Sequence, residues 1–280
     1  MFDIVRKKSL NKTVMLMEIL APQVAKKAEP GQFIILRATE DGERIPLTVA
    51  DFDREKGTVT IIFQIVGATT KAMSMLNEGD CLVDFVGPLG RATHTEGLKK
   101  VAVVGGGVGC AIAYPVAKKL HGLGCEVHAI VGFRNKELVI LEEEFRAVSH
   151  KLFVMSDDGS AGEKGLVTDA LKRLIENGEQ YDEVIAIGPL VMMKFVSKLT
   201  KEYEIPTVVS MNPIMIDGTG MCGGCRLSVG GEMKFACVDG PEFDGHLVDF
   251  DEAMDRASMY RDFEQHAYEK TCNLFRKEVE

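Results

Sequence analysis

The sequence predicts a β-barrel followed by an α/β domain with a parallel sheet and a small C-terminal module. Three observations support this architecture. Short β-branched runs follow one another up to about residue 97, strands and helices alternate from Lys99, and residues 217–237 are rich in glycine and cysteine. We therefore expect domains at 1–97, 98–212 and 213–280.

The first domain contains runs that are typical of short antiparallel strands. They cover residues 13–19, 31–37, 58–66 and 81–86, and the second run follows a turn at Pro30-Gly31. A short helix is expected to begin near Thr69, with the adjacent threonines as its cap. Strands at this spacing favour an antiparallel barrel.

In the second domain, buried strands alternate with helices. Strands are expected at 100–104, 126–133, 151–156, 184–188 and 207–210, with a helix over 110–123. This alternation predicts a Rossmann-like domain, in which right-handed crossovers connect parallel strands. The last segment begins rich in glycine and cysteine and ends in a polar tail that is expected to be helical.

Charge and composition exclude several classes of function. The 280 residues carry a net charge of -9, which argues against a surface for nucleic acid or an anionic membrane. No apolar run reaches the roughly eighteen residues that span a bilayer, and the N-terminus lacks the features of a signal peptide. A cytoplasmic location is expected, where the seven cysteines stay reduced unless a metal holds them.

A glycine-rich turn, Gly105 to Gly109, joins the first strand and helix of the second domain. Glycine lets a phosphate approach the backbone, and the helix N-terminus offers free N–H groups to an anion. The turn is shorter than the full dinucleotide motif, so a tight turn without a ligand is the alternative. Later strand ends at Asp157 and Gly188-Pro189 favour the nucleotide, because parallel sheets bind ligands at their carboxyl edge.

Two other residues of this domain are ambiguous. Arg134 ends the second strand, where it could contact a ribose or a phosphate, but it does not decide between NAD and NADP. Cys110 begins the helix after the glycine turn. Its position there would lower the pKa of a reactive thiol, and a buried packing residue is at least as good an interpretation.

Two loops of the barrel could hold another nucleotide. Arg44 could pair with a diphosphate and Thr48 could donate a hydrogen bond to a ring nitrogen, although an Arg before a Pro is usually part of a solvated turn. Gly67 and the threonines after it precede a helix, so they could hold a diphosphate or simply cap that helix. A barrel with one nucleotide, followed by an α/β domain with another, resembles the ferredoxin–NADP reductase superfamily. That resemblance implies FAD in the barrel and a nicotinamide nucleotide in the second domain.

The C-terminal module carries the most specific pattern, Asp217-x4-Cys222-x2-Cys225-x11-Cys237. Thiolates on a glycine-rich loop can hold an iron–sulfur cluster, because glycine allows unusual φ values and lets N–H groups face the sulfurs. Zinc and redox-active thiols are the alternatives. Zinc would need a fourth strong ligand, and the nearest histidine, His246, lies nine residues past Cys237.

The whole chain is similar to the iron–sulfur, FAD and NAD-binding electron-transfer subunits of bacterial dihydroorotate dehydrogenase. The resemblance is carried by RIPLTVADF, QIVGATTKAM, GPLGR, VAVVGGGVGCA, IGPLVMM, DGTGMCGGCR and CVDGPEFDGHLVDFDEAM. That family has a cysteine where this chain has Asp217. An aspartate with three cysteines resembles the small (alpha) subunits of NADH-dependent reduced ferredoxin:NADP oxidoreductases, the electron-bifurcating transhydrogenases. Sulfide dehydrogenase beta subunits and sulfhydrogenase gamma subunits are near neighbours.

The resemblance implies roles for individual residues. A [2Fe–2S] cluster would be ligated by Asp217, Cys222, Cys225 and Cys237. FAD would contact Arg44, Pro46, Leu47, Thr48, Ile65, Val66, Gly67, Thr69, Thr70 and Phe243, with Thr48 as the candidate catalytic residue at the flavin ring. The nicotinamide nucleotide would contact Gly106, Gly107, Val108, Gly109, Arg134, Asp157, Gly188 and Pro189.

This chain departs from the flavin motif of the superfamily, Arg-x-Tyr-Ser. Leu47-Thr48 stand at the Tyr-Ser positions, so aromatic stacking is absent, and Arg44 falls one residue early.

The resemblance also implies a relay from NADH through FAD and the cluster to a large partner subunit with its own flavin and [4Fe–4S] centres. Ferredoxin would react through that complex. One flavin site and one cluster loop are too few for bifurcation, so a heterodimer is expected, and the tail from Glu252 to Glu280 is a candidate docking element or a solvated helix. A zinc-stapled, nucleotide-binding regulator is the non-enzyme alternative.

Overall fold

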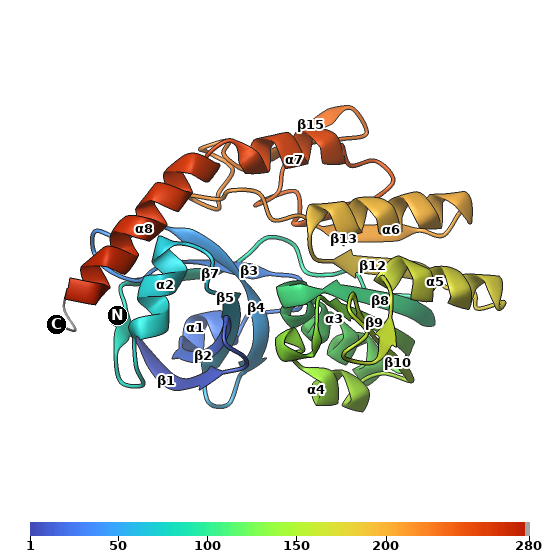
Figure 1. The fold of residues 1–280 in the computed structure, drawn as a ribbon, viewed down its shortest axis with the longest axis horizontal. Helices are drawn as coiled ribbons and strands as arrows, with labels where there is room; N and C mark the ends of the chain where they lie inside the picture. The colour runs from blue at the N-terminus through green and yellow to red at the C-terminus, as the bar shows by residue number, and fades with distance from the viewer. Residues whose placement is uncertain (278–280) are drawn as a thin grey trace.

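The computed structural model describes residues 1–277, which form a barrel, a second sheet flanked by helices, and a C-terminal segment that extends over both (Figure 1). The barrel sheet is antiparallel, with strand order β6-β1-β2-β5-β4-β3-β7. Its elements are β1 (Phe2–Ser9), β2 (Val14–Leu20), α1 (Pro22–Ala25), β3 (Phe33–Arg37), β4 (Ile45–Asp53), β5 (Thr58–Gln64), α2 (Ala68–Met75), β6 (Cys81–Leu82) and β7 (Asp84–Leu89).

Alternating side chains build the barrel interior. On β5, Val59, Ile61 and Phe63 are all buried, because every second residue of a strand points to the same face. The structure adds the strand β1, which was not expected from the sequence, and differs from the expectation in two further details. The run 81–86 is divided into β6 and β7, and the cap of α2 is Gly67, because the Thr70 hydroxyl accepts hydrogen bonds from the preceding loop instead.

The second sheet has the order β11-β10-β9-β8-β12-β13-β16, and all its pairs are parallel except β13 with β16. Its strands are β8 (Lys100–Gly106), β9 (Glu126–Phe133), β10 (Lys151–Ser156), β11 (Glu163–Lys164), β12 (Glu183–Ile187), β13 (Thr207–Ser210) and β16 (Glu242–Asp244). The helices are η1 (Gly107–Gly109), α3 (Cys110–Gly122), η2 (Lys136–Leu138), α4 (Glu142–Ala147), α5 (Val167–Glu176) and α6 (Leu190–Glu202).

Helices cover both faces of this sheet, which explains the continuous apolar run in β8. Val101 and Val103 pack in the cluster that contains α3, whereas Ala102 and Val104 pack in the cluster that contains α5 and α6. A strand that is buried on both faces has no polar side to alternate with. The predicted parallel-sheet domain is therefore confirmed.

The C-terminal segment contains the hairpin β14 (Arg226–Val229) and β15 (Glu232–Phe235), then β16, α7 (Phe250–Ser258) and α8 (Arg261–Lys277). In Figure 1, α8 descends along the outside of the barrel beside α2. Because β16 pairs with β13, the segment also contributes a strand to the second sheet. The domain boundaries at 97 and 212 stay predictions, and the end of the predicted third domain, 278–280, lies outside the described residues. No helix in the described part of the chain is long and apolar enough to cross a membrane.

Candidate nucleotide and metal site

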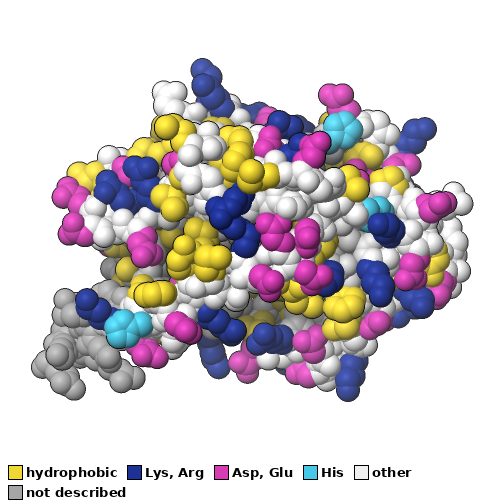
Figure 2. All heavy atoms as spheres, turned by 90° about the horizontal axis from the view of Figure 1, so that it is seen from above, with side chains coloured by type: hydrophobic (Ala, Val, Ile, Leu, Met, Phe, Trp, Pro, Cys, Tyr) yellow, Lys and Arg dark blue, Asp and Glu magenta, His cyan; other side chains and the backbone are white. Residues whose placement is uncertain are grey.

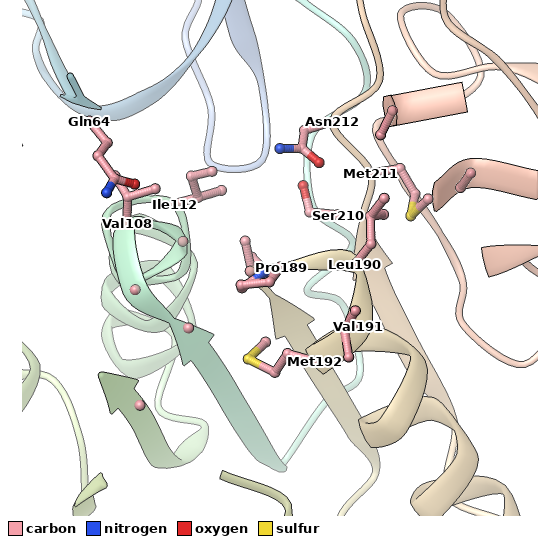
Figure 3. Close-up of a pocket in the computed structure, with 18 of the residues that line it drawn as sticks. Gln64, Val108, Ile112, Pro189, Leu190, Val191, Met192, Ser210, Met211 and Asn212 are labelled. Atoms are coloured by element: carbon pink, nitrogen blue, oxygen red, sulfur yellow. The ribbon is translucent and has the colours of Figure 1, made fainter. Parts of the chain in front are cut away.

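A cavity of about 1200 Å³ lies at the carboxyl edge of the second sheet (Figure 3). One wall comes from the barrel, and another comes from the C-terminal segment. All eight residues predicted to contact a nicotinamide nucleotide line this cavity: Gly106, Gly107, Val108, Gly109, Arg134, Asp157, Gly188 and Pro189. Their roles toward a nucleotide stay predictions, but the structure brings them together.

The glycine turn after β8 is tight on one side and open on the other. A Cβ at Gly109 would lie 2.5 Å from the carbonyl oxygen of Ile187, so the turn can pack against β12 only without a side chain. Gly107 has a φ of 55° and open space where a Cβ would be. Because η1 and α3 begin at this point, their N-terminal amides and positive dipole end lie at the cavity, which suits a diphosphate.

The two charged residues predicted for this site come from neighbouring strand ends. Arg134 follows β9 and Asp157 follows β10, and both are exposed at the cavity wall. Backbone bonds tie the two loops, since the Asp157 amide donates to the Phe133 carbonyl at 3.1 Å. Cys110 is fully buried, and burial raises the pKa of its thiol, so it is a packing residue rather than a reactive one.

The residues predicted to contact FAD lie on the barrel. Pro46, Leu47 and Thr48 are half-buried in β4, with Phe33 of β3 opposite Thr48. Arg44 is exposed, and its guanidinium lies 3.7 Å from the Asp84 carboxylate.

The predicted diphosphate loop before α2 leaves room for a ligand. A Cβ at Gly67 would meet no atom within 4 Å, while Ile65 and Thr69 are half-buried and Val66 is exposed. The Thr70 hydroxyl accepts from the amides of Val66 and Gly67 at 3.1 and 3.0 Å, so it is used to hold the loop. Of the described barrel residues predicted for FAD, none lines the cavity at the second sheet.

The metal-binding loop, Asp217 to Cys237, carries three cysteines and one carboxylate. Cys225 and Cys237 are buried and Cys222 is exposed. Backbone amides face the sulfurs, with Gly224 N lying 3.5 Å from Cys222 Sγ and Cys237 N lying 3.4 Å from Cys225 Sγ. Such amides stabilise thiolate ligands of iron–sulfur clusters.

Asp217 is oriented toward these cysteines by the loop itself. One carboxylate oxygen accepts from Thr219 N at 2.6 Å, and the other accepts from Cys222 N at 2.8 Å. These bonds lower the pKa of Asp217, so the group is an anion, while burial and the adjacent Cys225 raise the pKa of Cys237 to about 12. The donor set of one carboxylate and three thiols fits the predicted cluster.

The histidine nearest in sequence to the cysteines, His246, contacts the second domain. His246 Nε2 lies 3.0 Å from the hydroxyl of Thr200, so its ring is bound to α6. Within the described residues, the loop therefore offers zinc one carboxylate in place of a usual imidazole or fourth thiolate.

The metal-binding loop rests on the barrel. A Cβ at Gly218 would lie 2.7 Å from Leu89 Cδ1 and 2.9 Å from Ile35 Cδ1, which belong to β7 and β3. The next strand after β3 in the sheet is β4, which carries the predicted flavin residues. Phe243, the other residue predicted near the flavin, is half-buried in β16 opposite Val209, and its contact with a flavin stays a prediction.

Sequence reasoning missed the residues that complete the cavity. The barrel supplies Asn11, Thr13, Val14 and Gln64, the end of β13 supplies Ser210 and Asn212, and the C-terminal segment supplies Arg226 and Arg256, among others. The guanidinium of Arg256 also donates to the Gly224 carbonyl at 3.2 Å, between the first two cysteines. The end of the predicted strand 207–210 could have indicated Ser210, but the other residues are far apart in sequence.

Residues 212–249 match the family described as the iron–sulfur cluster binding domain of dihydroorotate dehydrogenase B. A homologue of the electron-transfer subunit of dihydroorotate dehydrogenase B (NAD(+)) from Thermotoga maritima is 47% identical over 268 residues. The alignment covers 96% of this chain and 94% of that protein. The chain belongs to this family of electron-transfer subunits and their homologues.

Two further comparisons agree with the family. An uncharacterised protein of Clostridium beijerinckii is 56% identical, with 93% of this chain and 91% of that protein covered. A chain in the solved structure of the NADH-dependent reduced ferredoxin–NADP oxidoreductase, studied for flavin-based electron bifurcation, is 47% identical. It has a TM-score of 0.91 and covers 96% of both chains.

These matches confirm the predicted fold, the resemblance to the bifurcating oxidoreductase and the class of iron–sulfur oxidoreductase subunit. A member of an electron-transfer subunit family acts within a larger complex, so a partner subunit is implied.

Proposed function

We propose that the chain is the electron-transfer subunit of a flavin-based electron-bifurcating NADH-dependent reduced ferredoxin:NADP oxidoreductase. The observation that carries this proposal is Asp217, whose carboxylate is bound into the C-x-x-C loop at 2.8 Å from Cys222 N. The similarity to the solved bifurcating enzyme over nearly the whole chain supports it.

In this proposal, each part of the chain binds one redox partner. The glycine turn Gly106–Gly109 binds the diphosphate of NAD(H), and Arg134 and Asp157 contact its adenosine end. Pro46, Leu47 and Thr48 support the FAD ring, with Thr48 beside its reactive nitrogen, and the Gly67 loop holds the FAD diphosphate. FAD supplies the conversion between a hydride and single electrons, which NAD(H) cannot perform.

The metal-binding loop would hold the centre that carries single electrons. Asp217, Cys222, Cys225 and Cys237 hold a [2Fe–2S] cluster. The contact of Gly218 with β3 and β7 fixes the loop against the barrel, one strand away from the flavin residues of β4. A fixed contact of this kind favours electron transfer because the protein sets distance and orientation.

The proposed partner is a larger subunit with its own flavin and [4Fe–4S] centres, through which ferredoxin reacts. Exposed apolar side chains next to the metal ligands support a docking face there. They are Met221, which is 89% exposed, and Ile214 and Ile216, which also line the rim of the cavity. Figure 2 views the C-terminal side of the molecule, where hydrophobic patches lie among charged side chains. We propose that the complex is a heterodimer in the cytoplasm.

A second candidate is an electron-transfer subunit of dihydroorotate dehydrogenase B, which the match over residues 212–249 favours. The dihydroorotate dehydrogenase family has a cysteine where this chain has Asp217. The aspartate therefore favours the first candidate. Sulfide dehydrogenase and sulfhydrogenase subunits are variants of the same architecture with other partners.

The purified native complex distinguishes these functions. The proposal predicts NADP⁺ reduction that requires NADH and reduced ferredoxin together. Reduction of NADP⁺ with one of these donors alone would contradict bifurcation. Dihydroorotate-dependent reduction of NAD⁺ by the same complex would establish the second candidate instead.

A further inference from the structure

Ser210 and Asn212 lie on the cavity wall where β13 ends. The strands β12 and β13 run parallel, with Ala186 opposite Val209, so this end of β13 stands beside the Gly188-Pro189 turn. In Figure 3, both side chains lie near Pro189 and Leu190, across the cavity from Gln64 and Val108. They therefore border the part of the cavity between the second sheet and the barrel.

The residue between Ser210 and Asn212 is anchored in the hydrophobic core. Met211, between them, is 2% exposed and belongs to the hydrophobic core, and its amide donates to the Pro241 carbonyl at 2.8 Å. Residues 211 and 212 follow the end of β13, and in Figure 3 the side chain of Met211 extends away from those of Ser210 and Asn212.

Both side chains are available to a ligand. Among the residues that the structure describes, neither the Ser210 hydroxyl nor the Asn212 amide has a hydrogen-bond partner, and Gln64 is in the same condition across the cavity. Asn11, which also lines the cavity, is different. Its amide oxygen accepts from Thr13 N and Val14 N at 2.8 and 2.9 Å, so it serves the local turn.

The chemistry of the pair fits a primary carboxamide. The asparagine amide presents an acceptor oxygen and a donor NH₂, and the serine hydroxyl is both donor and acceptor. A carboxamide presents the complementary set. A phosphate or carboxylate offers only acceptors, so it would pair with the NH₂ and hydroxyl donors and leave the amide oxygen of Asn212 without a partner.

We propose that Ser210 and Asn212 are positioning residues that bind the carboxamide of the nicotinamide ring and thereby hold the ring toward the barrel. This assignment rests on the proposed function, because it takes NAD(H) as the occupant of the cavity. It adds to that function a residue pair that selects nicotinamide over its carboxylic acid analogue.

Binding of two nucleotides to the purified full-length chain tests the assignment. NAD⁺ carries the carboxamide, whereas ADP-ribose has the same diphosphate but no nicotinamide. Asn212→Ala is expected to weaken NAD⁺ binding about tenfold, as loss of one good hydrogen bond does, and to change ADP-ribose binding by less than about twofold. Ser210→Ala is expected to act in the same direction with a smaller effect. Isothermal titration calorimetry measures both dissociation constants.

Two control variants show which part of the nucleotide each side chain contacts. Arg134→Ala is expected to weaken both ligands equally, because it contacts the part that they share. Equal weakening of both ligands by Asn212→Ala, or no weakening, would overturn the assignment. The assignment would also be overturned if Gln64→Ala lost NAD⁺ binding selectively while Asn212→Ala bound NAD⁺ normally. Gln64 of the barrel would then be the residue that contacts the carboxamide. If wild-type protein bound neither nucleotide, the proposed function would fail, and this assignment with it.

Discussion

The hydroxyl of Thr93 donates a 2.7 Å hydrogen bond to Oε1 of Glu242, joining the segment after the barrel to β16. Beside this bond, the amide of Arg91 donates to the Gly240 carbonyl at 2.7 Å. The stretch that follows Cys237 is thus tied to the barrel, while Gly218 contacts the barrel before the cysteines. The metal-binding loop is held on both sides, which keeps its ligands at a fixed place relative to β3 and β4.

The same contact makes stability depend on pH. Burial raises the pKa of Glu242 from 4.5 to about 7; Glu183 adds to the rise and the Thr93 bond opposes it. Because the folded-state pKa is the higher one, the unfolded state ionises first, so stability falls as pH rises from about 4.5 to about 7. The glutamine of Glu242→Gln cannot ionise. We expect the free energy of unfolding of this variant to rise relative to the wild type by about 1–3 kcal/mol across this window, and the difference to stay constant at higher pH.

Urea unfolding at several pH values measures this difference. The exposed Glu264→Gln variant is the control. Its free energy of unfolding should depend on pH in the same way as that of the wild type. A stability difference for Glu242→Gln that stays the same at every pH would show that ionisation of Glu242 does not act on folding.

Two glycines at opposite ends of α3 should respond in opposite ways to alanine. At Gly109 a Cβ would lie 2.5 Å from the Ile187 carbonyl oxygen, so β8 and β12 must move apart, and we expect a loss of about 2–4 kcal/mol. At Gly122 a Cβ meets open space at the helix end, so alanine should be neutral or stabilise by up to about 1 kcal/mol. Thermal and urea unfolding compare the variants, and equal effects would contradict the tight turn.

Variants of Asp217 test the oxygen ligand. Asp217→Cys should retain the cluster and change its electron paramagnetic resonance spectrum and reduction potential, because ligand type sets both. Asp217→Ala should lose most of its iron. Asp239→Ala is a matched control, since Asp239 also accepts a backbone bond in this module, from Phe235 N at 2.8 Å, without belonging to the donor set. An unchanged spectrum in Asp217→Cys would mean that Asp217 is not a ligand.

The proposed docking face can be tested in the native complex. Met221→Asp and Ile216→Ser should weaken association with the large subunit at least about tenfold, because each removes exposed apolar area from the face. Leu123→Ser changes a side chain that is 59% exposed at the end of α3, and it should leave association unchanged. Analytical ultracentrifugation gives the dissociation constants. If the Leu123 variant dissociates as readily as the other two, the face is placed wrongly.

The parts of the fold that could be predicted are those that local patterns determine. The alternation on β5 and the continuous apolar run of β8 each reflect how those strands are buried. β1 escaped prediction because Arg6, Lys7 and Lys8 interrupt any apolar pattern along its outer part. The pairing of β16 with β13 joins segments more than thirty residues apart, which no local pattern reports.

In the candidate site, too, the features that local sequence patterns determine could be predicted, and those that depend on long-range contacts could not. The glycine turn and the cysteine spacing are short-range features. The structure brings the residues predicted from the glycine turn to one cavity. The cavity wall is not local, because Gln64, Asn212 and Arg256 come from the barrel, the end of β13 and α7. Only the folded chain shows that these three side chains share one space.

The metal and flavin content of the purified protein distinguishes an electron-transfer subunit from a zinc protein. We predict about two iron atoms and about two acid-labile sulfides per chain, together with bound FAD. A colourless protein that contains zinc and lacks iron and flavin would contradict the account and support a zinc-stapled nucleotide-binding protein instead.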